Sequence, residues 1–489
     1  MRPVRSTRGA ALLARMPMLA PVALLASVAL LLAGGPLASP ARASAGQPPI
    51  KHVFIVMLEN KGFDETFGHL SPAPYLSQTL PAMGALLPNY YGVTHVSLGN
   101  YIALVSGQGS NPLTQTDCPV FLDVFPGTIG ADGQATGVGC VYPAAAKTVA
   151  DQLTGAGLSW KGYMEDMGVA CRHPALGSVD GTQTARRGDQ YTTRHNPFVY
   201  FHSLLDSGAC ARNDVPLTRL PGDLASAGTM PTFSLITPNL CNDGHDAPCV
   251  DGHPGGLVGA NAFLSTWVPR ILASAAYRNG GLLAVLFDEA DGTDASACCG
   301  EPPFPNTLNN GGANLGRGGG RTGAVLLSPY IDPGTIDHRP YNHFAMLRSV
   351  EDLFGLGHLG YAAMAGLNSL GADAFTCYAP APRASRGRLP NGSEIKFAVI
   401  GQGTAPRPMV ELKLWHGGRV SVQAARTAAR GRARGGKRGR ARPAPMRAVG
   451  RAQTVSACQL LKIRLPYTHG RAVVTVRAYR GVERRTLSF

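Results

Sequence analysis

Short apolar runs that end in polar residues recur along the first three-quarters of the chain. The run from Val53 to Leu58 is almost wholly apolar and rich in β-branched residues, and Thr232–Thr237, Gly281–Phe287 and Gly323–Leu327 repeat the pattern. Continuous apolar runs of this length predict strands that are buried on both faces, as in a parallel sheet.

Helical patterns lie between these runs. Asn261–Ala275 and Asn342–Phe354 are the clearest, and in the second Leu347, Val350 and Phe354 fall on one helical face. Strands that alternate with helices predict an α/β fold, with a doubly wound, mostly parallel sheet sandwiched by helices.

Acidic, amide and imidazole side chains follow the predicted strands. They are Glu59, Asn60, Asp243, His245, Asp288 and Glu289. Ligands in open α/β sheets bind beyond the carboxyl ends of the strands, and oxygen-rich side chains suit a hard cation. Any one of these residues alone is equally well explained as a solvated loop residue. Several at one sheet edge favour a metal site.

Ser97 is the candidate nucleophile. A helix that begins near Leu98 places this serine at its N-terminus, where backbone N–H groups and the helix dipole favour an anion. The alternative is a simple helix cap, which is the commonest role of serine at such a position. A metal on the serine oxygen would favour catalysis because it stabilises the alkoxide.

The charge is concentrated in two segments. The chain has 489 residues and a net charge of +15, yet residues 1–45 hold five arginines and no acid, and residues 426–451 hold ten basic residues and no acid. The remainder has thirty basic and thirty acidic residues. A neutral body argues against a dedicated nucleic-acid-binding domain.

Residues 1–45 are predicted to be a signal peptide, which makes the protein secreted or envelope-located. Arg2, Arg5, Arg8 and Arg15 precede an apolar stretch, and Ala43–Ala45 is a small-x-small cleavage site. An uncleaved membrane anchor is the alternative.

Ten cysteines fit an exported chain with disulfides. Cys118–Cys140 and Cys241–Cys249 are predicted local bridges. The adjacent Cys298 and Cys299 are predicted to pair with different partners.

Residues 376–489 are predicted to form a small antiparallel β unit. Apolar residues alternate in 394–400, 410–414, 461–465 and 474–478. Cys377 and Cys458 flank the unit and are candidates to staple it.

A basic insert interrupts this β unit. Residues 424–451 are rich in Gly, Ala, Pro and Arg and lack apolar periodicity, which predicts disorder. Arg426–Arg451 is predicted to contact an anionic membrane or nucleic-acid surface. An insert without any role is the alternative.

Seven segments, in order, resemble motifs of one family. They are LENKGFDETFG, HVSLGNYIALVSG, SWKGYMEDM, RHNPFVYF, PNLCNDGHD, LFDEADG and YNHFAMLRSVEDLFGL, and they cover about residues 50–360. They resemble the bacterial phosphoesterase family of secreted acid phosphatases and phospholipases C, which is related to the alkaline phosphatase superfamily.

This resemblance implies an alkaline-phosphatase-like catalytic domain over residues 46–375. It implies a metal held by Glu59, Asn60, Asp288 and Glu289, with Ser97 as both nucleophile and metal ligand. The histidines that match the family motifs, and are predicted to be catalytic, are His195, His245 and His343. The family usually has proline where this chain has Gly99, so the loop geometry there is expected to differ.

The ligands and substrate contacts can be specified further. A ligand set made mostly of oxygen suits Ca²⁺, Mg²⁺ or Mn²⁺ better than Zn²⁺. Asn100 and Lys161 are predicted to bind substrate, with Arg172 as an alternative to Lys161 for the phosphate.

The predicted function is that of a secreted, metal-dependent acid phosphatase. It would hydrolyse phosphate monoesters, including phosphoinositides, through a phosphoserine intermediate. A phospholipase C-type phosphodiesterase is one alternative, and a non-catalytic envelope protein that binds anionic surfaces is another. No specific protein partner is predicted.

Overall fold

The computed structural model describes residues 47–312 and 316–378 and, towards the C-terminus, 395–401, 408–414, 418–426, 445–455, 461–467, 470–478 and 481–488. The predicted signal peptide lies outside the described residues. Within them, none of the helices is both long and apolar enough to cross a membrane.

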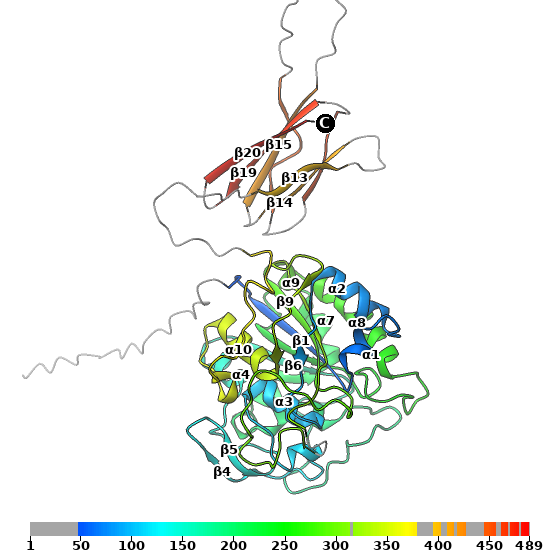
Figure 1. Ribbon diagram of the computed structural model, residues 1–489, viewed down its shortest axis with the longest axis vertical. Helices are drawn as coiled ribbons and strands as arrows, with labels where there is room; N and C mark the ends of the chain where they lie inside the picture. The colour runs from blue at the N-terminus through cyan, green and yellow to red at the C-terminus, as the bar shows by residue number, and fades with distance from the viewer. Residues whose placement is uncertain are drawn as a thin grey trace, which may run out of the picture. The chain divides into compact units, whose positions relative to one another are not determined.

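An eight-stranded sheet forms the centre of the larger part (Figure 1). In spatial order its strands are β11 (Thr335–Ile336), β2 (Ala85–Leu87), β10 (Ala324–Leu327), β9 (Gly281–Phe287), β1 (His52–Leu58), β8 (Phe233–Thr237), β6 (Trp160–Met164) and β7 (Asp214–Pro216). Only β10 runs antiparallel to its neighbours. The predicted doubly wound, mostly parallel sheet is confirmed.

Strand β1 shows why the sheet needs helices on both sides. All seven of its residues are buried. Val53, Ile55 and Met57 belong to one apolar core, whereas Phe54 and Val56 belong to the other. Alternate side chains of a strand point to opposite faces, so each face must be covered.

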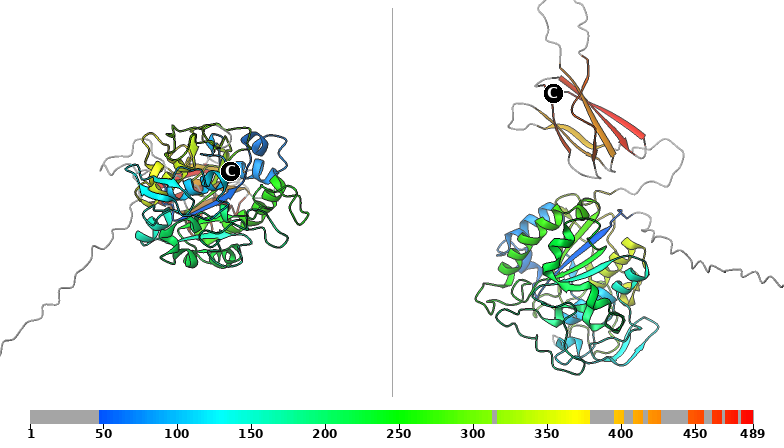
Figure 2. Two further views of the ribbon diagram at one scale, coloured as in Figure 1. Left: turned by 90° about the horizontal axis from the view of Figure 1, so that it is seen from below. Right: turned by 180° about the vertical axis from the view of Figure 1, so that it is seen from behind.

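Helices cover both faces, as Figures 1 and 2 show. One face carries α3 (Ser97–Ser106), α4 (Val149–Gly155) and α10 (His343–Phe354). The other carries α2 (Leu80–Met83), α7 (Leu220–Leu224), α8 (Gly256–Ala273) and α9 (Ala275–Arg278). The two helices predicted from sequence correspond to α8 and α10, and the predicted apolar face of α10 is buried.

Short elements complete this part. They are α1 (Phe63–Phe67), α5 (His202–Leu205), α6 (Ala209–Asn213), the paired strands β3 (Tyr90–Tyr91) and β12 (Tyr341–Asn342), the hairpin β4 (Phe125–Ile129) and β5 (Ala135–Val138), the π-helix η1 (Tyr75–Thr79), and the 3₁₀ turns η2 (Thr114–Thr116), η3 (Thr193–His195), η4 (Pro197–Tyr200), η5 (Leu217–Arg219) and η7 (Gly360–Ala363).

Disulfides tie the loops of this part. The predicted pairs Cys118–Cys140 and Cys241–Cys249 are confirmed, and Cys171–Cys210 is a further pair. The prediction that Cys298 and Cys299 have different partners is wrong, because they pair with each other. A turn at Cys299, whose φ is 68°, brings the two neighbouring side chains together. Cys377 is also disulfide-bonded, and Cys458 lies outside the described residues.

The C-terminal strands pair antiparallel, as predicted. One sheet contains β13 (Ile395–Gly401), β14 (Met409–Leu414) and β18 (Leu461–Arg464), and the other contains β15 (Gly418–Arg426), β16 (Arg447–Ala448), β17 (Gln453–Val455), β19 (Gly470–Ala478) and β20 (Gly481–Ser488). Their buried residues form a separate apolar core.

The predicted basic insert is shorter than expected. Residues 424–426 belong to β15 and residues 447–448 to β16, and these strands pair with each other through Gln423↔Ala448 and Ala424↔Arg447. The limits 424–451 were therefore too wide, because the ends of the basic segment continue a strand pair. Residues 427–444 lie outside the described residues.

Candidate active site

The candidate site lies at the edge of the sheet formed by the carboxyl ends of β1, β8 and β9. Glu59 follows β1 directly, Asp288 follows β9 directly, and Asp243 lies in the loop after β8. The backbone amide of Glu59 donates to the Asp243 carbonyl at 2.9 Å, and the Asp288 amide donates to the Leu58 carbonyl at 2.9 Å. These backbone hydrogen bonds hold together the segments that carry Glu59, Asp243 and Asp288.

Ser97 is the first residue of α3 and points at this group of acids. Its side chain is buried, and its Oγ donates to Glu59 Oε2 at 2.7 Å. Val96 occupies the N-cap position, and its apolar side chain makes no capping hydrogen bond. The Ser97 hydroxyl thus hydrogen-bonds the carboxylate of Glu59, which follows β1. The alternative that Ser97 is only a helix cap has no support in this geometry.

Asp117 caps α3 from a distant loop. Its Oδ1 accepts a hydrogen bond from the Leu98 amide at 2.9 Å. Gly99, where the family usually has proline, lies in the same first turn, and a Cβ on it would collide with Ser110 and Thr94. These two side chains fill the space beside the helix start.

Glu59 and Asp288 share the centre of the site. Glu59 is fully buried, and its Oε1 accepts a hydrogen bond from the Tyr101 hydroxyl at 2.5 Å. The backbone amide of Asn60 donates to Asp288 Oδ1 at 3.0 Å, and Asn60 adopts a left-handed φ of 58°. Asparagine tolerates this conformation better than most residues, which explains an Asn directly after the glutamate.

Burial and mutual repulsion raise the pKa values of these acids. Burial raises the pKa of Glu59 well above its usual range, and the charges of Asp288 and Asp243 add to the effect. Burial raises the pKa of Asp288 to about 6. The pKa values of Asp243 and Glu289 are also raised, again mainly by burial. So many buried acids are costly unless a cation or protons offset their charge.

His195 lies between two of the acids. Its Nδ1 is 3.2 Å from Asp243 Oδ2, and its Nε2 is 3.4 Å from Glu59 Oε2. The ring stacks on Tyr101, with ring centroids 5.3 Å apart. Burial lowers the pKa of His195 well below its usual range, and the charge of Arg194 lowers it further.

His245 forms the more open side of the site, since its side chain is 34% exposed. Its Nδ1 donates to Asp246 Oδ1 at 2.7 Å, and its Nε2 accepts from Arg194 Nη2 at 3.4 Å. Arg194 is buried, and its Nε lies 3.4 Å from Asp117 Oδ2, with which it forms an ion pair. Burial and Arg194 together lower the pKa of His245.

Glu289 is paired with a residue that the sequence analysis missed. Its Oε2 contacts Nδ1 of His95, whose Nε2 lies 3.0 Å from the Asp294 carbonyl oxygen. His95 stands two residues before Ser97, and this proximity is the one sequence feature that pointed to it. Asp117 and Arg194 were missed because their roles depend on contacts between distant loops.

His343 contacts the backbone of the site and none of its acidic side chains. Its Nε2 donates to the Asp288 carbonyl at 2.6 Å, and its Nδ1 accepts from the Tyr90 hydroxyl at 3.1 Å. Both ring nitrogens are therefore occupied. Burial lowers the pKa of His343 to about 4, which keeps the ring neutral.

The two predicted substrate-binding residues make internal contacts instead. Asn100 Oδ1 accepts from the amides of Val93 and Thr94, and its Nδ2 donates to the Thr94 carbonyl at 2.8 Å. It therefore shapes the loop before Ser97. Lys161 pairs with Asp223 at 2.6 Å.

The position of Lys161 along its strand explains this outcome. Lys161 lies opposite Ser234, three residues before the aligned ends of β6 and β8, whereas the candidate site lies beyond those ends. Arg172, the alternative, forms a two-fold hydrogen-bonded pair with Asp189.

The donor set fits a divalent cation. Asp243 Oδ2, Asp288 Oδ2 and both ring nitrogens of His195 are buried and have no hydrogen-bond partner among the described residues. Unpaired anionic oxygens are costly to bury unless a cation or a proton satisfies them. Hard oxygen donors predominate, as a Ca²⁺, Mg²⁺ or Mn²⁺ site requires.

Known proteins resemble this chain in sequence. The Phosphoesterase family matches residues 73–357, more than half of the chain. A phosphatidylinositol-3-phosphatase of Mycobacterium tuberculosis is 27% identical over 326 residues, which cover 66% of this chain and 83% of that protein. An acid phosphatase of Aspergillus fumigatus is 26% identical over 63% of this chain and 55% of its own.

The chain thus spans about half the length of that fungal relative. Among solved structures, a protein in the alkaline phosphatase superfamily from Vibrio parahaemolyticus aligns with a TM-score of 0.40 and 12% identity, over 68% of this chain and 74% of that one. The match over residues 73–357 shows that the chain belongs to the phosphoesterase family.

Proposed function

We propose that this phosphoesterase hydrolyses phosphate monoesters, with Ser97 as the nucleophile. One observation carries the proposal: the Ser97 hydroxyl lies at the start of α3 and donates to a buried carboxylate at 2.7 Å. A hydroxyl that faces a proton acceptor at a helix N-terminus is well placed to attack an anionic phosphoryl group.

The substrate class follows from the relatives. Family membership makes the chain a phosphoric ester hydrolase, and the phosphatidylinositol-3-phosphatase and acid phosphatase relatives support monoesters, phosphoinositides among them. A phospholipase C-type diesterase remains the alternative activity. We also propose that residues 1–45 export the protein, which fits the disulfides of the described part.

A divalent metal would be held mainly by the residues after β1 and β9, together with the first residue of α3. These are Glu59, Asn60, Asp288 and Glu289, and Ser97, with Asp243 and His195 adjacent. When bound, it would offset the negative charge of the phosphoryl group and lower the pKa of the serine hydroxyl.

The chain's own residues can carry out the proton transfers of the first step. The Ser97 proton moves to Glu59 Oε2, which already accepts the hydrogen bond of the Ser97 hydroxyl. The Ser97 Oγ–phosphorus bond forms while the bond to the leaving oxygen breaks in line. The positive end of α3 stabilises the anion that develops there.

His245 is the candidate proton donor for the leaving oxygen. It is the more exposed of the two histidines in the site, so it can reach a substrate at the entrance. Its lowered pKa makes the charged form a stronger acid than an ordinary imidazolium and restricts that form to acidic pH. In the second step, water gives a proton to the neutral His245 as its oxygen bonds to phosphorus, the Ser97 Oγ–phosphorus bond breaks, and the proton held by Glu59 returns to Ser97 Oγ as phosphate leaves.

Three further residues act by positioning others. His343 holds the Asp288 backbone, His95 orients Glu289, and Asn100 fixes the loop before Ser97. This assignment gives His343 a supporting role in place of the catalytic one predicted from sequence. Residues that orient ligands in this way commonly change activity 10–100-fold when they are altered, by the general rule for second-shell partners.

A phosphate-release assay tests the proposal. Wild type and Ser97→Ala are compared on a soluble phosphate monoester and on a matched diester, each with and without a chelator. We expect chelator-sensitive release from the monoester by wild type alone. Preference for the diester would favour the phospholipase C alternative, and the absence of release from either ester would favour the non-catalytic surface-binding alternative.

A further inference from the structure

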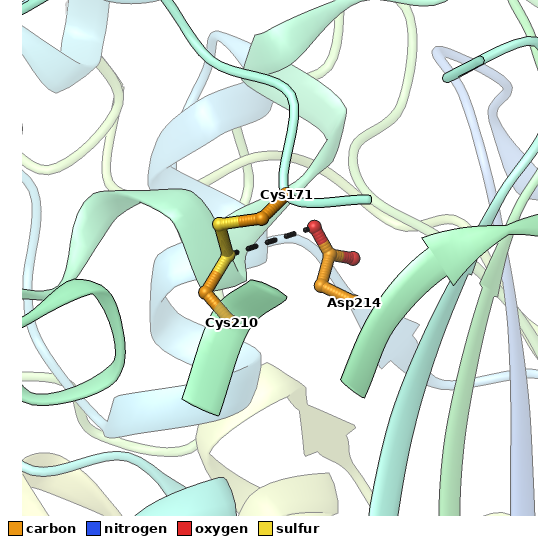
Figure 3. A group of neighbouring side chains, drawn as sticks. All are labelled: Cys171, Cys210 and Asp214. Carbon is orange, nitrogen blue, oxygen red and sulfur yellow. Dashed lines mark hydrogen bonds between the residues drawn. A yellow bond between two sulfur atoms is a disulfide. The ribbon is translucent and has the colours of Figure 1, made fainter. Parts of the chain in front are cut away.

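Asp214 is a fully buried acid that the proposed mechanism does not use. It begins β7 and lies beside Gly162 of β6, where a Cβ would come within 2.5 Å of Asp214 Oδ1. Figure 3 shows the carboxylate beside the Cys171–Cys210 disulfide, with Cys210 Sγ 3.9 Å from Oδ2. Disulfide sulfurs carry no hydrogen, so these cysteines neither donate to Asp214 nor bind a metal as thiolates.

Asn196 is the side chain that donates a hydrogen bond to Asp214. Its Nδ2 donates to Asp214 Oδ2 at 2.7 Å and to the Tyr191 hydroxyl at 3.0 Å, whereas Asp214 Oδ1 and Asn196 Oδ1 have no hydrogen-bond partner among the described residues. Both Asn196 and Asp214 are completely buried. The Tyr191 hydroxyl in turn donates to the Arg172 carbonyl at 2.8 Å, which ties this pair to a neighbouring loop.

Asn196 follows His195 directly and joins η3 to η4. His195 itself has no well-aligned hydrogen bond among the described residues, although its ring lies 3.2 Å and 3.4 Å from two carboxylates. Stacking on Tyr101 and a tilted contact with the His245 ring, whose centroid is 6.2 Å away, surround the buried ring without giving it a directional hydrogen bond. The backbone of 193–196, which carries the ring, therefore helps to set where it lies.

We infer that Asp214 is a positioning residue, which fixes His195 between Asp243 and Glu59 by accepting the hydrogen bond of Asn196. This inference rests on the proposed function, because it takes His195 to belong to the active site. It assigns a role at the far edge of the sheet to a pair of residues that touches neither substrate nor metal.

Exchange of the donor and the acceptor tests this inference. Asn196→Asp alone places two carboxyl groups face to face, so the hydrogen bond is lost unless one group holds a proton. The double variant Asn196→Asp with Asp214→Asn restores the hydrogen bond in the reverse direction. Asp214→Asn alone keeps an acceptor of the same shape. Asp223→Asn is the matched control, because Asp223 is a carboxylate that pairs with Lys161 away from His195.

The expected results concern kcat for a soluble monoester, measured across pH with KM and a thermal melt. Asn196→Asp should lower kcat about tenfold or more at pH 8, in line with other supporting residues, with KM little changed. Its kcat should recover as the pH falls, because one shared proton restores the bond. Tyr191 is the other titratable group against this pair, with Arg172 and Asp180 beyond it. The double variant, Asp214→Asn and Asp223→Asn should stay near wild type.

Two results would overturn the inference. One is a folded Asn196→Asp variant with wild-type kcat at pH 8. The other is a folded double variant whose kcat at pH 8 is tenfold or more below that of wild type, and this second result decides the matter even if Asn196→Asp does not fold. If Ser97→Ala is inactive while the exchange has no effect, only this inference fails. Full activity of Ser97→Ala would instead remove the proposed function.

Discussion

Asp288 shows at the residue scale how burial and chemistry are linked. Its carboxylate is completely buried, one oxygen accepts from the Asn60 amide, and the other has no hydrogen-bond partner among the described residues. A charge so placed is destabilising unless a cation pairs with it. The unsatisfied oxygen is therefore better explained by a ligand than by folding stability.

Asp288→Asn should weaken metal affinity and lower turnover. The substitution keeps the shape of the side chain and removes one negative charge from the site. Excess divalent metal should partly restore the rate, because mass action compensates for weaker binding. Titration calorimetry with Mg²⁺, Mn²⁺ and Ca²⁺, beside the rate, measures both effects. Activity that ignores both the substitution and a chelator would remove the metal from the account.

Asp214 gives a prediction for stability against pH. Burial raises its pKa to about 7, above the unfolded value of about 4. Between these values the folded protein holds a proton that the unfolded chain has lost, so stability falls as the pH rises through this window. Asp214→Asn removes the buried charge and should be more stable than wild type, by a few kcal/mol above pH 7.

Urea unfolding at pH 5 and pH 8 measures this difference. The gap between Asp214→Asn and wild type should be clearly larger at pH 8. An equal gap at both pH values would show that Asp214 does not titrate in this range.

At the scale of elements, α3 depends on a residue outside itself. The side chain of Val96 cannot cap the helix. Asp117, which directly precedes the Cys118–Cys140 disulfide, accepts a hydrogen bond from the backbone amide of Leu98 instead. An acid at a helix N-terminus both satisfies an amide and complements the dipole. The same carboxylate also pairs with Arg194, so it connects the nucleophile's helix to the His245 side of the site.

Asp117→Ala should therefore affect stability and activity together. The free energy of unfolding should fall by about 1–2 kcal/mol, the usual cost of removing a helix cap. Turnover should fall as well, because both α3 and Arg194 lose their partner. Asp117→Asn, which keeps the acceptor, should retain most of the stability. Denaturant unfolding and steady-state rates of the two variants test this, and a fully stable, fully active Asp117→Ala would contradict it.

The elements also show what the sequence could predict. The continuous apolar runs of β1, β8, β9 and β10 predicted the central strands within a residue or two, because burial on both faces leaves a strong pattern. β6 was missed because Lys161 and Gly162 interrupt its apolar run. β2, β7 and β11 have only two or three residues, too few for a pattern.

The site was predictable where the polar residue directly follows a strand or begins a helix. Glu59, Asn60 and Asp288 come together with Ser97, the first residue of α3, as expected. His343 and Asn100 belong to segments that resemble family motifs, yet their side chains form hydrogen bonds with backbone groups. Sequence spacing cannot reveal such hydrogen bonds.

At the scale of the whole molecule, the excess positive charge belongs mainly to segments outside the described residues. Residues 427–444 carry seven of the chain's basic residues and no acid. Their flanks belong to β15 and β16, so removal of 427–444 alone leaves both paired strands in place. The segment can thus be tested separately from the strands that hold it.

Deletion of 427–444 should leave turnover of a small soluble monoester nearly unchanged. Binding to anionic vesicles should weaken, most clearly at low salt, because surface charge is screened beyond about 8–10 Å at ordinary ionic strength. Vesicle sedimentation at two salt concentrations measures the effect, with neutral vesicles as the control. A large loss of soluble turnover would show that the segment contributes to the active site.

The central claim is that Ser97 is phosphorylated during turnover. Wild type is mixed with a ³²P-labelled monoester, quenched in acid within one turnover and digested, and the labelled peptide is identified by mass spectrometry. The account predicts label on Ser97, none on Ser97→Ala, and a loss of several orders of magnitude in turnover for that folded variant. Label on another residue, or near-normal turnover of Ser97→Ala, would contradict it.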